Sequence, residues 1–287
     1  MSLLLILISF VYLRLITAEE ECLIGYYCAH NGTIDSYCDL KMGHSAMSSA
    51  GQSMCIPDLK IKNVFGNDAR VQVTSKDYPW RAIGYLNTGC TGTLVGRDLV
   101  LTAAHCVIDS NTQQLNNIRT FYPNRMNGKA EDSSEISWVW WGTTKPDTYR
   151  EDDWALLRLT KPLGDQYGYF GYKTLDDSAM LAAQGTLVGY SVNFHNGQTA
   201  GAHIGCRITK KLRNNFYLHN CHSGRGSSGG PIFAFWDNSP YIYALNVAEY
   251  RNGGTESLWL SQYTETNANI AIWSQQLFQK IDELRKS

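Results

Sequence analysis

Short runs in which apolar and polar residues alternate recur along this chain from residue 71 onward, and they constrain the fold more than any other feature. Turn-forming Gly, Asn, Asp and Ser residues separate the runs, as expected for strands. Many short strands at such spacing are typical of an all-β barrel or sandwich. The candidate strands are Val71–Thr74, Tyr78–Leu86, Ile136–Trp141, Trp154–Leu159, Gly185–Tyr190, Gly205–Thr209, Asn215–His219, Pro231–Phe235 and Tyr241–Ala248.

Two further segments have a readable pattern. Cys90–Thr102 predicts a β-hairpin, because two apolar strands flank a Gly-Arg-Asp turn. Only Trp273–Lys286 has helical periodicity, and Ser274 is a candidate N-cap. Its apolar face would carry Trp273, Leu277, Ile281 and Leu284.

Charge and composition exclude several functions. The 287-residue chain has a formal net charge of −1 and 44% hydrophobic residues, enough for a sizeable core. Because Lys and Arg form no long block, nucleic acid and anionic membranes are not expected as partners. None of the eight cysteines stands in a C-x-x-C pair, which argues against zinc. We expect no metal and no organic cofactor.

Residues 1–18 form an apolar run that Arg14 interrupts and the small residue Ala18 ends. The run is shorter than the roughly 20 apolar residues of a spanning helix. It predicts a secretory signal peptide cleaved after about Ala18, with a membrane anchor as the alternative. An even number of cysteines behind such a signal predicts disulfides in a secreted, extracellular protein without membrane attachment in its mature form.

Residues 19–70 hold four cysteines and a glycosylation sequon at Asn31. Two internal disulfides are the simplest account of a segment with so little core, and three pairings are open. A pro-segment, a small recognition module and a stapled extension without a separate role all fit this composition. Its end is a polar linker that proteases could reach, so a mature chain would begin between Lys60 and Val71. The four cysteines are Cys22, Cys28, Cys38 and Cys55.

The stretch Gly226–Pro231 places Ser228 between glycines, where the backbone can turn tightly and hold a hydroxyl outward. Such a turn can aim the N–H groups of Gly226 and Ser228 at one point, which makes a candidate oxyanion hole. A Gly-Ser run is by itself more often a plain loop, so the motif needs support elsewhere in the chain.

Two upstream motifs give that support. Leu101–Cys106 presents His105 after a strand, beside a cysteine that Cys90 could bridge across the hairpin. In Glu151–Leu159, Asp153 stands next to an apolar strand, where its carboxylate can orient an imidazole. A solvated acidic turn is the alternative for this acidic run, and it suits Glu151 and Asp152.

These motifs, in the order His, Asp, Ser, resemble those of the chymotrypsin-fold serine endopeptidases. The resemblance covers about residue 71 to the C-terminal helix. It implies two antiparallel six-stranded β-barrels, about 71–165 and 166–272, in a peptidase domain of residues 71–287 with a helix at 273–286. By position, Ser228 would be the nucleophile, His105 the general base and Asp153 the orienting carboxylate. It also implies the oxyanion donors Gly226 and Ser228 and the disulfides Cys90–Cys106 and Cys206–Cys221.

The sequence departs from trypsin-like members in two places. Ser227 stands where those members carry the aspartate that pairs with a new N-terminal amine, so that activation step is not expected. The surroundings of Cys221 and Ser228 resemble the glutamyl-endopeptidase branch more closely. Its pattern implies a hypothesis in which a weakly electropositive pocket favours Glu or Asp before the cut bond; a small neutral pocket with His222 packed away is the alternative. The candidate pocket residues are His222, Ser223, Arg225 and Asn246.

The sequence therefore predicts a secreted, monomeric serine endopeptidase that acts on proteins or peptides through an acyl-enzyme. The alternative is a catalytically silent homologue that binds a partner, with residues 19–62 as its binding module. The presence of all three triad residue types favours the enzyme.

Overall fold

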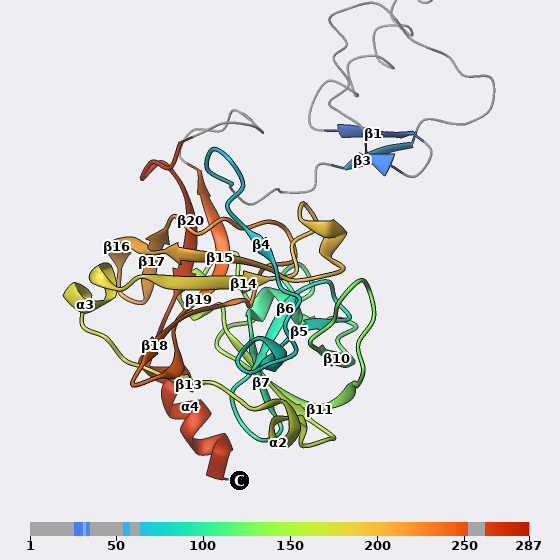
Figure 1. Ribbon diagram of the computed structural model, residues 1–287, viewed down its shortest axis with the longest axis vertical. Helices are drawn as coiled ribbons and strands as arrows, with labels where there is room; N and C mark the ends of the chain where they lie inside the picture. The colour runs from blue at the N-terminus through green and yellow to red at the C-terminus, as the bar shows by residue number, and fades with distance from the viewer. Residues whose placement is uncertain (1–25, 31–32, 35–53, 58–63, 252–261, 287) are drawn as a thin grey trace, which may run out of the picture. The chain divides into compact units, whose positions relative to one another are not determined.

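The computed structural model describes residues 26–30, 33–34, 54–57, 64–251 and 262–286 (Figure 1). The chain divides into two compact units, Met1–Lys60 and Ile61–Ser287. Among the described residues, no helix is both long and apolar enough to cross a membrane.

In the first unit, three short strands form an antiparallel sheet. β1 (Tyr26–His30) pairs with β2 (Thr33–Ile34) on one side and with β3 (Met54–Pro57) on the other. The backbone register places Cys28 opposite Cys55. The predicted signal peptide, the glycosylation at Asn31 and the pairing of the four N-terminal cysteines lie outside what the structure describes.

The first half of the second unit is a closed six-stranded barrel in the order β10-β11-β12-β7-β6-β5. All neighbouring strands in it are antiparallel. Its strands are β5 (Ile83–Leu86), β6 (Thr91–Leu94), β7 (Leu99–Thr102), β10 (Thr120–Pro123), β11 (Ser134–Trp141) and β12 (Ala155–Leu159).

The barrel core explains why these segments are strands. Every residue of β6 and of β7 is buried, and the side chains of Leu101, Phe121 and Leu157 are fully enclosed. Burial of a Leu or Phe side chain contributes about 1.5–3 kcal/mol each. The strand β10 was not among the sequence candidates, because Thr120–Pro123 is short and ends in a proline that weakens its strand pattern.

The second half is a nine-stranded sheet, in which most strands are yellow to red in Figure 1 and β4 is cyan. Its pairing runs as one path, β16-β17-β20-β19-β18-β14-β15-β4, and β13 adds to β19 in parallel. Its strands are β4 (Val71–Gln72), β13 (Gly171–Tyr172), β14 (Gly185–Gly189), β15 (Gly201–Cys206), β16 (Ile208–Arg213), β17 (Phe216–His219), β18 (Pro231–Trp236), β19 (Ser239–Arg251) and β20 (Asn267–Ile272).

Backbone pairing in this sheet does not give the closed six-stranded second barrel expected from the resemblance. The outer edge of β15 pairs with β4, and no ladder among the described residues joins the two ends of the path. The predicted single strand Gly205–Thr209 is the junction of two strands instead. Gly205 has a φ of +81°, a conformation that favours glycine, at the end of β15, and β16 begins at Ile208.

Helical segments are few and short, except at the C-terminus. The 3₁₀ turns η3 (Ala104–Cys106) and η4 (Arg150–Asp152) precede strands or loops of the barrel. The C-terminal helix α4 (Gln275–Lys286) begins after Ser274, whose hydroxyl accepts a hydrogen bond from the Leu277 N–H at 3.3 Å. The remaining segments are η2 (Trp80–Ala82), β8 (Ile108–Asp109), β9 (Gln114–Leu115), α2 (Leu163–Tyr167), α3 (Asp177–Ala182) and η5 (His195–Gly197).

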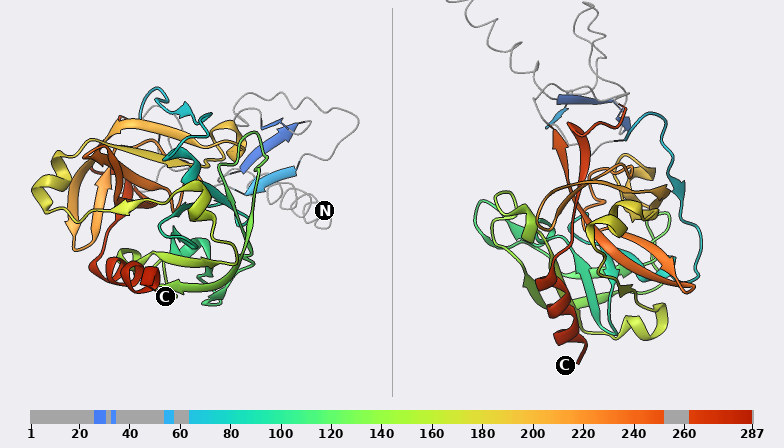
Figure 2. Two further views of the ribbon diagram at one scale, coloured as in Figure 1. Left: turned by 60° about the horizontal axis from the view of Figure 1, so that its bottom comes forward. Right: turned by 90° about the vertical axis from the view of Figure 1, so that its left-hand side faces the viewer.

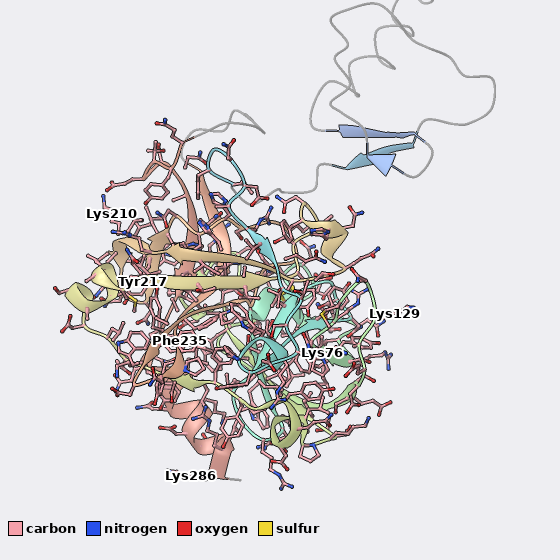
Figure 3. The ribbon with its side chains drawn as sticks, in the orientation of Figure 1. Lys76, Lys129, Lys210, Tyr217, Phe235 and Lys286 are labelled. Atoms are coloured by element: carbon pink, nitrogen blue, oxygen red, sulfur yellow. A yellow bond between two sulfur atoms is a disulfide. The ribbon has the colours of Figure 1, made fainter. Side chains whose placement is uncertain are left out.

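Helix α4 lies beside the barrel and also contacts the second half (Figure 2). Its face with Leu277, Phe278, Ile281 and Leu284 is buried. The exposed side chains of Lys129 and Lys286 project at the margin of the molecule in Figure 3.

Candidate active site

His105 and Asp153 are in direct contact. His105 lies in η3, immediately after β7, and Asp153 follows η4, immediately before Trp154 and β12. The His105 Nδ1 and Asp153 Oδ2 are 2.7 Å apart, and the His105 backbone N–H donates to Asp153 Oδ1 at 2.9 Å. Because β7 and β12 are paired, with Ala155 opposite Thr102, the barrel itself sets this distance.

The aspartate is almost enclosed, whereas the imidazole is reachable. The Asp153 side chain is 4% exposed and that of His105 is 30% exposed. A buried carboxylate at one ring nitrogen fixes the imidazole tautomer and leaves the other nitrogen to face a reacting group.

Hydrogen bonds attach the loop that carries Ser228, here called the serine loop, to the barrel strands β6 and β7. The Thr91 N–H donates to the Ser228 carbonyl at 2.9 Å, and the Thr91 hydroxyl donates to the Gly226 carbonyl at 2.8 Å. The Thr102 hydroxyl in turn donates to the Thr91 carbonyl at 2.8 Å. Thr102 belongs to the motif that presents His105 and Thr91 to no motif, and neither threonine was predicted to join the serine loop to the histidine strand.

A disulfide closes this arrangement. Cys90, next to Thr91, is bonded to Cys106, next to His105, which is the pairing the resemblance implied. The Cys106 sulfur lies 3.8 Å from the Ser228 carbonyl oxygen. The backbone of Ser228 is therefore held beside the residue that follows His105.

The turn around Ser228 requires glycine at two positions. Gly226 has a φ of +95°, and a Cβ there would lie 2.3 Å from the Tyr190 carbonyl oxygen. Gly229 has a φ of +79°, and a Cβ there would lie 2.2 Å from the Thr102 hydroxyl. The turn pairs the N–H of Ser227 with the Gly224 carbonyl and the N–H of Gly229 with the Asn246 carbonyl.

Ser227 lies in a buried, neutral hydrogen-bond network. Its hydroxyl donates to the Gly224 carbonyl at 2.6 Å and contacts the Ser223 hydroxyl at 2.7 Å. The Asn246 side-chain N–H₂ donates to the Ser227 carbonyl at 2.8 Å, and its oxygen is 3.2 Å from His219 Nε2. A hydroxyl in this position needs no cationic partner, unlike a buried carboxylate.

Of the predicted pocket residues, Ser223 and Asn246 therefore point into this network. Both are 0% exposed. Their contacts support the serine loop from behind. Arg225 differs from them in that its side chain is exposed. Its backbone carbonyl accepts a hydrogen bond from the Val192 N–H.

His222 is held by the chain segment that precedes the sheet. Its Nδ1 accepts a hydrogen bond from the Ala69 N–H at 3.0 Å, and Asp68 Oδ1 lies 3.5 Å from it. Burial lowers the pKa of His222, and the carboxylate of Asp68 opposes this. No sequence pattern predicted that residues before Val71 contact His222.

Asp68 and Arg70 fix that segment. The Arg70 side chain is 2% exposed, pairs with Asp68 at 2.6 Å and donates to the Asn193 side chain at 3.0 Å. Burial raises the pKa of Asp68, but the hydrogen bonds from Arg70 outweigh it, so the pKa lies below the usual value.

One cluster of possible metal ligands occurs among the described residues. It consists of Cys90, Cys106 and His105. Because the two cysteines form a disulfide, they present no thiolate, and thiolate is the form that binds metal. These residues therefore do not fit a metal site.

Comparison with known proteins gives the family of this chain. Residues 68–258 match the family described as Trypsin. The chain belongs to this trypsin family. Its match therefore includes Asp68 and Arg70 together with the three candidate catalytic residues.

Several curated proteins resemble this trypsin-family chain. A glutamyl endopeptidase of Bacillus licheniformis is 30% identical over 190 residues, which cover 60% of this chain and 55% of that protein. A protein named extracellular metalloprotease, from Bacillus subtilis, is 26% identical over 77% of this chain and 72% of its own length. Serine protease 23 of Rattus norvegicus is 32% identical over 50% of this chain and 42% of its own length. The chain thus matches about half the length of two of these relatives.

Solved structures show the same fold. A Glu endopeptidase in complex with MPD aligns with a TM-score of 0.66 at 19% identity, over 78% of this chain and all of that one. The protease Anisep from Arthrobacter nicotinovorans aligns with a TM-score of 0.55 at 22% identity, over 74% of this chain and 98% of that one. The fold is chymotrypsin-like, and the family is that of the serine proteases.

Proposed function

We propose that the protein is a secreted, monomeric serine endopeptidase whose catalytic residues are Ser228, His105 and Asp153. The observation that carries the proposal is the 2.7 Å contact between His105 and the buried Asp153, beside the fastened serine loop. A structural role alone would not require a partly exposed imidazole held by a buried carboxylate.

In the proposed mechanism, the Ser228 hydroxyl attacks the peptide carbonyl while His105 takes its proton. The bond to the leaving amine breaks as His105 returns that proton to the nitrogen, which leaves an acyl-enzyme. A water molecule then attacks the ester with His105 as base, and the acid product leaves. The N–H groups of Gly226 and Ser228 would hold the negative oxygen formed in both steps.

The direct test is turnover of a peptide mixture by the Ser228→Ala variant. Loss of one triad member removes nearly all catalysis, so we expect a fall of at least about 10³-fold with the folded state retained. Ser137→Ala, on the exposed face of β11, is the matched control and should keep wild-type activity. Undiminished hydrolysis by Ser228→Ala would place the nucleophile elsewhere.

We propose further that the enzyme prefers Glu or Asp before the cut bond. The supports are the relative and the solved structure named as glutamyl endopeptidases, and the cation Arg225, exposed three residues before Ser228. Cleavage of a peptide library, compared between wild type and Arg225→Gln, tests the preference. A dominant Lys, Arg or Phe at that substrate position would contradict it.

For processing, we propose removal of a pro-segment by a cut between Lys60 and Val71, on the N-terminal side of Ala69. Ala69 and Arg70 support this position, because both are bonded into the fold and their removal would leave His222 without its donor. The intact mass of the active form would give its N-terminus. Active protein that retains residues 19–62 in one continuous chain would refute removal.

A silent homologue is the alternative, and one relative favours considering it. A bovine protein named inactive serine protease 35 is 39% identical over 59 residues, which cover 19% of this chain. The retained Ser228 and the His105–Asp153 contact argue for the enzyme instead.

A further inference from the structure

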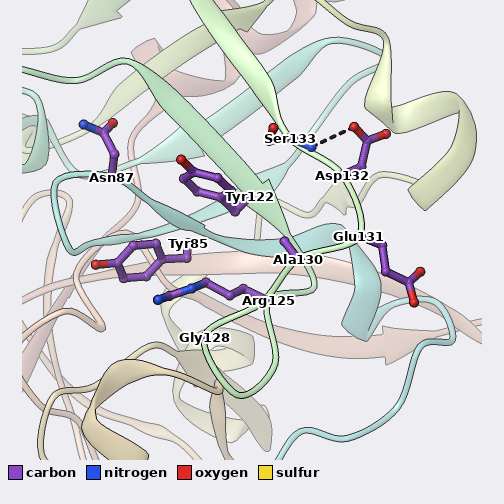
Figure 4. A pocket seen from close by; sticks show the side chains of 9 residues that line it. All are labelled: Tyr85, Asn87, Tyr122, Arg125, Gly128, Ala130, Glu131, Asp132 and Ser133. Carbon is purple, nitrogen blue, oxygen red and sulfur yellow. Dashed lines mark hydrogen bonds between the residues drawn. The ribbon is translucent and has the colours of Figure 1, made fainter.

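A cavity of about 560 Å³ opens on the barrel side of the molecule (Figure 4). Strands β5 and β10 and the loop between β10 and β11 form its walls. The lining residues are Tyr85, Asn87, Tyr122, Arg125, Gly128, Ala130, Glu131, Asp132 and Ser133.

The cavity adjoins the serine loop through one aromatic contact. The rings of Tyr85 and Tyr190 meet edge to face, with centroids 5.7 Å apart. The Tyr190 carbonyl oxygen and the Gly89 carbonyl oxygen are the atoms that a Cβ on Gly226 would meet, at 2.3 and 2.8 Å. Gly226 therefore lies against the β5–β6 turn, which follows the strand that carries Tyr85.

Charges in the cavity are not balanced. Glu131 pairs with Lys76, and Asp132 pairs with Lys161 at 3.0 Å, so both carboxylates have cations of their own. In Figure 4 these two acids point away from the guanidinium of Arg125. Among the described residues, no salt bridge involves Arg125.

Arg125 is held in place without a carboxylate. Its guanidinium carbon lies 4.1 Å from the ring centroid of Tyr85, and Nη1 donates to the Gly197 carbonyl at 3.3 Å. A guanidinium stacked in this way keeps donors for a planar, bidentate acceptor. The cavity thus presents one oriented cation, stacked on the ring of Tyr85.

Hydrogen bonds hold the loop that carries Arg125 in one conformation. Its turn has positive φ angles at Asn127 and Gly128, and Met126 and Lys129 bond to each other across it. The Asn127 N–H donates to the Thr199 hydroxyl at 2.8 Å, and the Gly128 N–H donates to the Gln198 carbonyl at 3.0 Å. Both halves of the fold therefore fix the site before any ligand arrives.

We propose that this cavity binds an acidic side chain of the peptide substrate on the leaving-group side of the cut bond, with Arg125 as the cation that receives it. The proposal rests on the proposed peptidase function. Residues 222–225 would hold the side that becomes the acyl-enzyme, so the chain that leaves would pass Gly226 toward the β5–β6 turn and this cavity. Arg125 would be a specificity-determining residue and take no part in bond breaking.

The test uses the full processed protein and C-terminally amidated peptides that carry Glu, or Gln in its place, at each of four positions after the cut bond. In wild type, Glu at one position should raise kcat/KM over Gln. Arg125→Gln should lower that Glu-to-Gln ratio by roughly tenfold, the scale of one charge-assisted hydrogen bond. Arg125→Lys should restore part of it, and Arg97→Gln, a distant exposed arginine, should not change it.

Two outcomes would overturn the proposal. The first is a Glu-to-Gln ratio of kcat/KM that is the same in wild type and Arg125→Gln. The second is a preference for acidic peptides that appears only when the same peptides are made with a free C-terminal carboxylate. Binding of the same peptides to Ser228→Ala, with and without Arg125→Gln, separates the two hypotheses. If the wild type hydrolyses no peptide but Arg125→Gln abolishes charge-selective binding, the proposed role of the cavity stands and the proposed peptidase function is wrong. Hydrolysis without charge selectivity would do the reverse.

Discussion

Single residues decide whether the serine loop can form. Ser228 lies next to two positions, 226 and 229, where the backbone has a positive φ and a neighbouring atom occupies the place of a Cβ. The Gly-Ser motif could be predicted from the sequence because such turns need glycine. The partners that fasten it, Thr91 and Thr102, could not, since a buried threonine gives no pattern that separates a positioning hydroxyl from ordinary packing.

Gly226→Ala should therefore destabilise the fold and lower turnover. The added methyl would meet the Tyr190 and Gly89 carbonyl oxygens in a strained backbone conformation, at a combined cost of about 2–5 kcal/mol. Gly205→Ala is the control, because Gly205 also has a positive φ but nothing lies within 4 Å of its Cβ position. It should cost only about 1–2 kcal/mol. Denaturant unfolding and peptide turnover measure both, and equal effects of the two changes would contradict this account.

At the scale of elements, β15 and the segment before the serine loop meet at two histidines. The His222 backbone N–H donates to His203 Nδ1 at 2.7 Å, and the centroids of the two imidazole rings are 4.2 Å apart. Burial lowers the pKa of His203 to about 4, and neighbouring His222 and Arg70 act in the same direction against Asp68. The disulfide Cys206–Cys221 joins the same two segments, as the resemblance implied.

This contact predicts a loss of stability on acidification. His203 is neutral when folded and has an ordinary pKa of 6.5 when unfolded, so the unfolded chain binds more protons between these values. The unfolding free energy should fall as the pH drops from 6.5 toward about 4. His203→Asn keeps an acceptor but not the titration, and it should flatten this slope in denaturant titrations. An unchanged slope would show that other groups cause the decrease.

At the scale of the whole molecule, helix α4 ties the two halves of the peptidase unit together. The Leu284 carbonyl accepts from Arg158 of β12 at 3.0 Å, while Arg285 donates to the carbonyls of Val95 and Phe170. The helix and its apolar face could be predicted from the 3.6-residue period. Its partners could not, because periodicity gives the buried face and not the surface that covers it.

Ile281→Ala should be costly because Ile281 is 0% exposed. The loss of a buried Ile side chain destabilises by about 2–5 kcal/mol. Gln279→Ala, on the exposed face of the same helix, should change stability by less than about 0.5 kcal/mol. Thermal and denaturant unfolding of the two variants provide the comparison, and similar losses in both would contradict the packing described for α4.

Contacts between residues far apart in the sequence were the part of the fold that the sequence could not predict. The order of the strands and the triad motifs could be read along the chain, and the barrel that brings His105 and Asp153 together was anticipated from the resemblance. The docking of Asp68–Arg70 against His222 was not, because the Ala69 N–H and the His222 side chain that it joins are 153 positions apart, and a backbone N–H leaves no trace in composition.

Labelling with a fluorophosphonate, followed by peptide mapping, tests the central claim most directly, because this reagent needs an activated serine hydroxyl rather than a particular substrate. The account predicts one adduct, on Ser228, in the processed wild type. The adduct should be absent from Ser228→Ala and strongly reduced in His105→Ala. No adduct on folded, processed protein, or an adduct that His105→Ala leaves at full yield, would contradict the claim that His105 activates Ser228.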